Sequence, residues 1–390
     1  MKQSNRRSIT TILVFCCLLA LAAAKIKFTF KTGQEGFFLF SGDKGYWLEI
    51  SDDVRPEELD RLLWALRTTI FKKVIHAPVC TDSSQSCLTF EWNKPAGNGY
   101  IKNIFPDGRK LLINLSRFEE NGAYPEGIFI GGGLPPSDPD YTSYNRNETG
   151  MAYFDGLRWH HVWCNANEGL ENVDSPFTSL PPIRWKYLGS QVLQNDSQSV
   201  TITSKHRVML DGTPLELRRF LHYQAGDSYI SLLTTVTNAG NTTARFIYSY
   251  GDEPWIGNYG TSIGNIGWYR DGLILHERSV DPVRYSSIGM FDYGNELAGE
   301  PHTFTGTANF IEWGAGSHPN KVYISNGEEV IENAPNPAPL SSPGNRILDL
   351  IWGPISLAPR QSFSFEIAVG MAANDPVSGM PVKPKTHLSP

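Results

Sequence analysis

The chain has 390 residues, of which 40% are hydrophobic and 19% charged, and its formal net charge at pH 7 is −6. This acidic balance argues against nucleic acid as a partner, because phosphate backbones attract basic surfaces. The 36 glycines, 26 prolines and 12% aromatic residues favour an all-β protein with many turns. The length favours one large domain or two fused domains.

Residues 1–24 have the pattern of a secretory signal peptide. A basic start precedes an apolar run at 9–21 and a small-residue exit at 22–24. The apolar run is short for a transmembrane helix, and no later stretch is apolar enough to cross a bilayer. We therefore expect the signal to be cleaved, leaving a secreted or periplasmic chain without a membrane span.

Residues 25–182 are predicted to form an N-terminal β-rich region with long loops and one helix at 56–72. The helix begins with a proline and three acidic residues, and its leucines fall on one face. Cys80 and Cys87 enclose a polar loop that a disulfide could close in an oxidising compartment. The alternative is three unpaired thiols in the mature chain, including Cys164.

Residues 183–374 are predicted to form a β-sandwich core, followed by a flexible tail at 375–390. At the centre, apolar residues alternate on both sides of a turn at 238–241, which predicts an antiparallel hairpin. A second hairpin is predicted at Asp211-Gly212. The expected fold is therefore all-β, a large antiparallel two-sheet sandwich of the supersandwich kind with one N-terminal helix.

The central stretch delivers two adjacent carboxylates, Asp252 and Glu253, just before a proline that ends the strand. Paired carboxylates perform acid/base catalysis when a site separates their pKa values, and a nearby tryptophan can raise one pKa and stack on a sugar ring. Alternatively, the two carboxylates point to opposite faces, one solvated and one capping a turn. Further candidate saccharide ligands on this glycine-rich stretch are Trp255, Asn258, Tyr259 and Trp268.

A second candidate cluster lies at 153–165, where strand alternation places His160 on one face and His161 with Trp163 on the other. One of the two histidines could be a general base or a sugar ligand, and Trp163 could stack on a sugar. A structural histidine packed among tryptophans is the alternative. No second cluster of metal-ligating residues lies at suitable spacing, so no metal site is predicted.

A third candidate is the basic run at 217–223. Arg218 or Arg219 could orient a hydroxyl or carboxylate from a strand face, although exposed arginines on strands commonly serve solubility alone.

From 183 to about 372 the chain resembles the galactose-mutarotase-like β-supersandwich group, which includes aldose epimerases and domains of polysaccharide-active enzymes. The resemblance rests on WKYLGS at 185–190, ITSKHRVMLDGTPLELRR at 202–219, SLLTTVTNAG at 231–240 and LAPRQSFSFEIAVG at 357–370. In the epimerases a histidine motif follows the third of these strands, with a later glutamate as base. Here the neighbourhood reads YGDEPWIGNYG, so no catalytic histidine is carried over, and Asp252 or Glu253 could occupy an acid/base position.

These patterns together predict an exported carbohydrate-active protein, of the hydrolase, lyase or epimerase class, that handles a saccharide on a concave sheet face. The acid/base groups would be Asp252 or Glu253 with His160 or His161. The alternatives are a non-catalytic exported module that binds glycan or protein, and a structural protein whose aromatic residues fill a large core.

Overall fold

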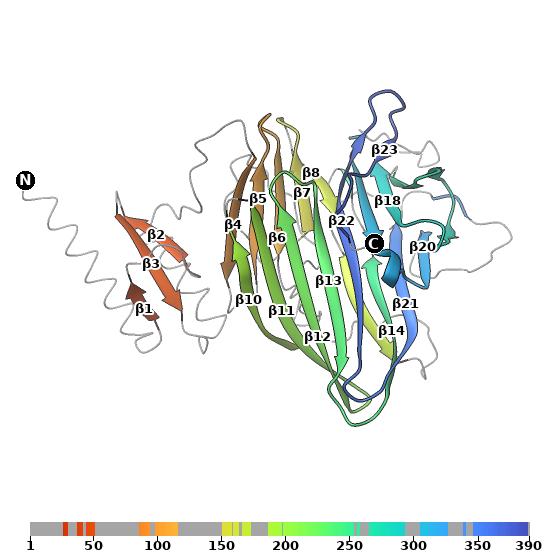
Figure 1. Ribbon diagram of the computed structural model, residues 1–390. Helices are drawn as coiled ribbons and strands as arrows, with labels where there is room; N and C mark the ends of the chain where they lie inside the picture. The colour runs from red at the N-terminus through yellow and green to blue at the C-terminus, as the bar shows by residue number, and fades with distance from the viewer. Residues whose placement is uncertain are drawn as a thin grey trace, which may run out of the picture.

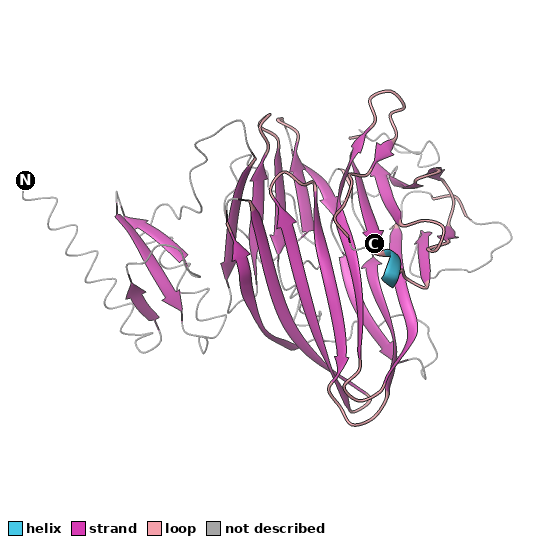
Figure 2. Ribbon diagram, in the orientation of Figure 1, coloured by secondary structure: helices cyan, strands magenta, loops and turns pink. Residues whose placement is uncertain are grey.

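The computed structural model describes residues 26–29, 37–41, 44–50, 86–93, 98–115, 150–157, 159–163, 166–172, 186–196, 198–252, 256–257, 265–292, 305–326, 338–340 and 346–388. Most of these residues lie in antiparallel strands, and the described part of the chain includes one 3₁₀ turn, η2 (Ala315–Ser317) (Figure 2). The all-β prediction is confirmed. The predicted helix at 56–72 lies outside the described residues.

Four sheets are present in the described part of the chain. A small N-terminal sheet has the order β1-β3-β2, a five-stranded sheet follows the order β4-β5-β6-β7-β8, and a second five-stranded sheet has the order β17-β20-β21-β14-β9. The largest sheet has ten strands in the order β10-β11-β12-β13-β22-β19-β18-β15-β16, with β23 beside β22. Their bounds are β1 (Ile26–Thr29), β2 (Phe37–Ser41), β3 (Lys44–Ile50), β4 (Cys87–Asn93), β5 (Asn98–Ile104), β6 (Lys110–Leu115), β7 (Gly150–Phe154), β8 (Trp159–Trp163), β9 (Ala166–Asn172), β10 (Lys186–Asn195), β11 (Ser199–Leu210), β12 (Thr213–Gln224), β13 (Tyr229–Asn238), β14 (Ala244–Asp252), β15 (Asn265–Tyr269), β16 (Gly272–Ile274), β17 (Arg278–Val280), β18 (Ser287–Asp292), β19 (Ala308–Trp313), β20 (Lys321–Ser325), β21 (Ile347–Leu357), β22 (Ser362–Asn374) and β23 (Pro381–Val382).

The ten-stranded sheet is one layer of a sandwich, and the two five-stranded sheets form the other. In Figure 1 strands β10–β13 and β22 lie over β4–β8, with β14, β20 and β21 beside them. One hydrophobic core contains residues from all three sheets, including Ile113, Leu221 and Leu350. This core draws on residues from both sides of position 183, where the sequence predicted a boundary between two regions. The predicted two-sheet sandwich is confirmed, with its second layer divided in two.

The two predicted hairpins have different outcomes. The Asp211-Gly212 hairpin is confirmed, because β11 pairs with β12 up to Leu210 opposite Thr213, and both turn residues have positive φ. The predicted hairpin of β13 with β14 is wrong: β13 pairs with β12 and β22, whereas β14 pairs with β21 and β9. The intervening turn carries the chain from one layer to the other. Asn238 stabilises this crossover, because its side-chain nitrogen donates to the carbonyl oxygens of Thr242 at 2.7 Å and Leu357 at 2.8 Å.

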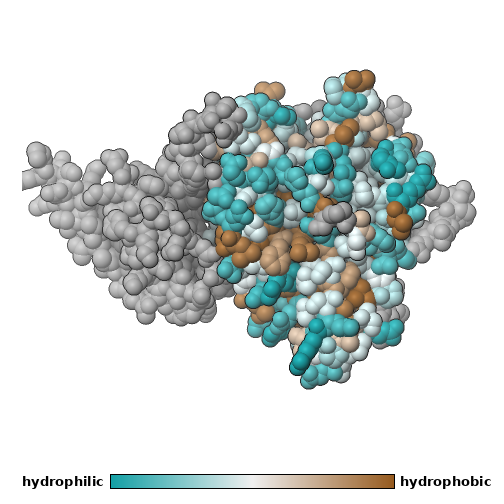
Figure 3. Space-filling view, viewed as in Figure 1, coloured by the Kyte–Doolittle hydropathy of each residue, from teal (hydrophilic) through white to brown (hydrophobic). Residues whose placement is uncertain are grey.

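The C-terminal segment packs against the outer face of the ten-stranded sheet. Residues 375–390 were predicted to be a flexible tail; the described part of them includes β23, which pairs with β22 at Ala373 and Asn374. Farther on, Lys383 Nζ and Thr386 Oγ1 donate to Glu312 Oε2 at 2.9 and 2.5 Å. Leu388 packs on a second hydrophobic cluster, composed of Tyr229, Ile266, Trp268, Phe291, Ala308, Phe310, Ala368 and Ala372. The space-filling view shows hydrophilic residues interleaved with separate hydrophobic patches (Figure 3).

Candidate functional site

Two stretches that the sequence analysis singled out meet in the fold. The amide nitrogen of His161 donates to the Gly257 carbonyl at 2.9 Å, and the Gly257 amide returns a bond to the His161 carbonyl at 3.0 Å. Strand β8 therefore lies beside the segment that follows β14. Asp252 is the last residue of β14, where its backbone pairs with Leu348 and Ala166. The remaining candidates of this region lie outside the described residues: Glu253, Trp255, Asn258 and Tyr259.

The two histidines of β8 occupy different environments. His160 is buried, and its Nε2 lies 2.7 Å from Asp155 Oδ2 at the turn between β7 and β8. His161 is 1% exposed and lies opposite Ala152. Burial, with a smaller contribution from the His160 charge, lowers the pKa of His161 from 6.5 to about 3. An imidazole with so low a pKa is a weak base, which favours a structural role for His161.

The predicted aromatic and basic ligands also differ in access. Trp163 is completely buried and stacks on Tyr250, with 6.5 Å between ring centroids. Trp268 is 4% exposed, and its indole nitrogen donates to the Asn309 carbonyl at 2.8 Å. Arg218 is exposed on the outer face of β12. The predicted Cys80–Cys87 disulfide stays a prediction, because Cys80 lies outside the described residues.

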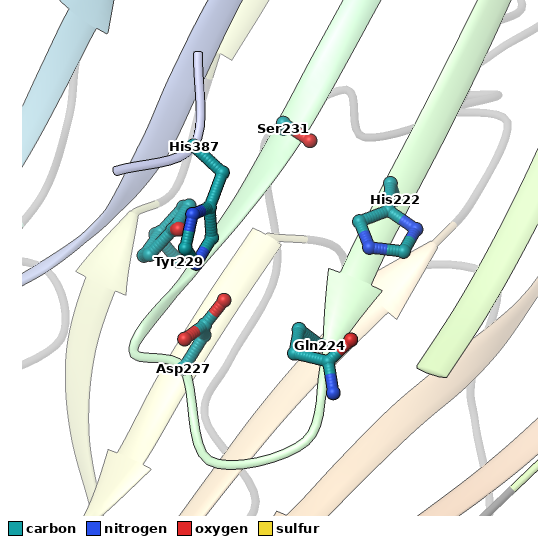
Figure 4. A pocket seen from close by; sticks show the side chains of 6 residues that line it. All are labelled: His222, Gln224, Asp227, Tyr229, Ser231 and His387. Atoms are coloured by element: carbon teal, nitrogen blue, oxygen red, sulfur yellow. The ribbon is translucent and has the colours of Figure 1, made fainter. Parts of the chain in front are cut away.

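A polar pocket of about 200 Å³ lies on the outer face of the ten-stranded sheet, on the side of β12 that carries Arg218. Its walls come from the end of β12, the start of β13 and the C-terminal segment (Figure 4). His222 lies opposite Ser231 in the register of these strands, and Gly226, with φ +92°, makes the connecting turn. The lining side chains are His222, Gln224, Asp227, Tyr229, Ser231 and His387. Figure 4 shows His222 on one side of the pocket and Asp227 with His387 on the other.

The charged states of this pocket are perturbed in a consistent direction. Desolvation raises the pKa of Asp227, although His387 and a hydrogen bond from Tyr229 act against the rise. Desolvation also lowers the pKa of His222, with Asp227 opposing the shift and His387 adding to it. The Nδ1 atom of His222 lies 2.8 Å from Thr201 Oγ1, which fixes the ring. Both shifts favour the uncharged forms, namely a carboxylic acid and a neutral imidazole.

Such a pair is suited to proton transfer. A carboxyl group with a raised pKa can donate a proton, and a neutral imidazole can accept one, when both face the same bound molecule. Desolvation likewise raises the pKa of Tyr229 to about 12, so its hydroxyl remains a hydrogen-bond donor at neutral pH.

The described residues show neither a group of three or more His, Cys, Asp or Glu side chains that could hold a metal ion, nor a helix long and apolar enough to span a membrane.

Sequence reasoning reached only the edge of this pocket. The basic run 217–223 contains His222, but the sequence predicted a ligand role only for its arginines. A signal was available, because positions 218, 222 and 224 carry polar side chains on one face of a long strand. His387 had no such signal, since it is distant in sequence and reaches the pocket only through the packing of the C-terminal segment.

No protein-family model matches the chain, and no curated protein matches it. Among solved structures, a protein assigned as an aldose 1-epimerase from Klebsiella pneumoniae is 10% identical with a TM-score of 0.38, over 77% of this chain and 85% of that one. A galactose mutarotase-like protein from Clostridium acetobutylicum is 9% identical with a TM-score of 0.32, over 74% and 98% of the two chains. The GH36 α-galactosidase AgaA from Geobacillus stearothermophilus is 11% identical with a TM-score of 0.32, over 76% of this chain and 40% of that enzyme.

The structural neighbours of the chain thus include aldose 1-epimerase and galactose mutarotase-like proteins, the group that its sequence resembles. At these TM-scores the likeness supports no argument about activity.

Proposed function

We propose that the protein binds a saccharide in the pocket of His222, Asp227 and Tyr229 and transfers protons on one sugar ring. The observation that supports this is the placement of an acid with a raised pKa and an imidazole with a lowered pKa around one small polar cavity. The cavity volume of about 200 Å³ lies below the range of roughly 300–1,000 Å³ that holds drug-sized ligands, so the occupant is small.

The lining favours an epimerase over a hydrolase. Hydrolysis of a glycosidic bond commonly uses two carboxylates, and Asp227 is the one carboxylate among the described residues that line the pocket. Opening of an aldose ring needs only an acid at the ring oxygen and a base at the anomeric hydroxyl. In their uncharged states, Asp227 is the acid and His222 is the base.

The polar neighbours of this pair fit a sugar ring. Gln224 and Ser231 offer donors and acceptors from β12 and β13. The Tyr229 ring packs at 6.5 Å from the ring of His387, which forms one wall of the pocket. Such a mixture of hydrogen-bonding groups and ring faces matches the alternating hydroxyls and C–H surfaces of a saccharide.

The end of β14 is a second candidate site for the same function. Asp252 and Glu253 would act there with His160, and the His161–Gly257 pairing supports this by bringing both stretches together. The same proposal includes export of the protein, with cleavage of residues 1–24 and formation of a Cys80–Cys87 disulfide. Its basis is the signal pattern and the spacing of the cysteines.

The test measures binding and ring opening separately. Saturation-transfer NMR with a panel of monosaccharides detects binding, and polarimetry on a pure anomer follows the interconversion of anomers. We expect Asp227→Asn and His222→Gln to lower the rate by about 10²- to 10⁴-fold, while a saccharide still binds.

Asp211→Asn is a matched control, because it makes the same chemical change in an exposed turn, and asparagine tolerates the left-handed backbone of this position. If the rate of anomer interconversion falls in Glu253→Gln but not in Asp227→Asn, the catalytic site lies at the end of β14 and not in this pocket. Binding without ring opening would leave a non-catalytic glycan-binding module. If no saccharide binds, the proposal is wrong.

A further inference from the structure

A second and larger cavity, of about 550 Å³, lies on the same outer face of the ten-stranded sheet. It is bounded by β15, the segment before β18, the end of β19 and β23. Trp268, Tyr285 and Trp313 line it from within the fold, while Val283, 77% exposed, gives it an accessible apolar wall. The lining also includes three cationic side chains: Arg270, Arg284 and Lys383. No carboxylate is among the described residues that line this cavity.

The two arginines are held in place and remain accessible. Asp271 accepts hydrogen bonds from the Tyr285 hydroxyl at 2.6 Å, from Arg284 Nη2 at 3.3 Å and from Arg270 Nε at 3.4 Å. The Arg284 guanidinium also lies 5.0 Å from the centre of the Tyr285 ring. The arginine side chains are nevertheless 73% and 65% exposed, so most of their donors face solvent. Lys383 is tied to Glu312 at 2.9 Å.

The two cavities share two structural elements, the outer hydrophobic cluster and the C-terminal segment. The outer hydrophobic cluster includes Tyr229, which lines the first pocket, and Trp268, which lines the second. The C-terminal segment contributes His387 to the first pocket and Lys383 to the second. Both cavities therefore lie on the same face of the sheet, with Tyr229 on β13 and Trp268 on β15, four strands apart.

We propose that the larger cavity binds an anionic group, a carboxylate or a sulfate, on a further residue of an acidic saccharide. Guanidinium groups recognise both anions through paired hydrogen bonds, and an apolar wall packs against the C–H face of a sugar ring. The volume suits a saccharide unit, since it falls within the range of roughly 300–1,000 Å³ that is typical of ligand sites. This inference rests on the saccharide function proposed above and names its substrate class as acidic glycans.

Isothermal titration calorimetry on the whole chain tests the inference with three trisaccharides of equal length: a neutral one, one of uronic acid and a sulfated one. We expect the best acidic ligand to bind about tenfold more tightly than the neutral one, because it adds charge-assisted hydrogen bonds. The preference should shrink as salt is raised, since the arginines are exposed. The uronate and sulfate arms show which anion the cavity accepts.

The double variant Arg270→Gln, Arg284→Gln should remove the preference and leave binding of the neutral trisaccharide unchanged. Arg207→Gln is the matched control, because Arg207 is a half-exposed arginine of the same sheet that also pairs with a carboxylate, Glu216. Equal binding of neutral and acidic trisaccharides by the wild type would overturn this inference but not the proposed function. A preference that survives in the double variant would overturn it as well. Absence of binding by all three, and by monosaccharides, would overturn both.

Discussion

His161 should make the protein sensitive to acid. Its pKa is lowered from 6.5 to about 3 in the fold, so the folded chain keeps this imidazole neutral while the unfolded chain protonates it below pH 6.5. The stabilisation from the neutral imidazole is complete above pH 6.5 and is lost as pH falls towards 3. Each unit of pKa difference corresponds to about 1.4 kcal/mol, so the full shift is worth about 5 kcal/mol.

Urea unfolding of the wild type and His161→Gln, at pH values from 7 to 4, measures this effect. At pH 5 the wild type should have lost about 2 kcal/mol more of its unfolding free energy, relative to pH 7, than the variant. His276→Gln is the control, because His276 is exposed. The unfolding free energy of this variant should change with pH as it does in the wild type. Parallel curves for the wild type and His161→Gln would refute the reasoning.

Three further changes test the packing. Gly257→Ala would place a Cβ 2.1 Å from Asp292 Oδ2, in a backbone with φ +86°. It should lower the unfolding free energy by about 2–4 kcal/mol in urea titrations. An unchanged urea midpoint would contradict this close approach. Trp352→Ala removes a buried ring that stacks on Phe365 with 4.0 Å between ring centroids. The unfolding free energy should fall by about 3–5 kcal/mol in the same assay. A fall below about 1 kcal/mol would show that the surrounding residues close the cavity. Glu312→Gln weakens the ion pair with Lys383 that holds the C-terminal segment. Limited proteolysis should therefore cleave that segment faster than in the wild type. Equal cleavage rates would show that the pairing of β23 with β22 is sufficient to hold it.

The sequence predicted the strands of the core better than their partners. Alternation of apolar residues located β11, β12, β13 and β14, because each buries one face. The turn at Asp211-Gly212 also fixed a partner, since two residues in the left-handed region leave room only for a tight hairpin. After β13 the longer turn allows the chain to change layers, and alternation contains no information on which strand will pair with which.

The candidate site was less predictable for a related reason. Two adjacent residues of β12 differ in exposure: Arg218 is exposed, whereas Arg219 is completely buried. Burial lowers the pKa of Arg219, although Tyr248 and Tyr250 act in the opposite direction. The sequence shows that the two point to opposite faces but not which face is covered. The partners of His222 come from β13 and from the C-terminal segment, so the pocket exists only in the folded register.

That register also explains why the pocket can be preorganised. Strand β12 is paired along its length with β11 and with β13, which places His222 between Thr201 on one side and Ser231 on the other. A slip of one residue would turn His222 into the core and Arg219 to the solvent, exposing the apolar residues of the inner face. The burial of Leu217, Leu221 and Tyr223 opposes such a slip. The free energy of the core therefore holds the proposed base, His222, in position before any ligand arrives, which lowers the entropy lost on binding.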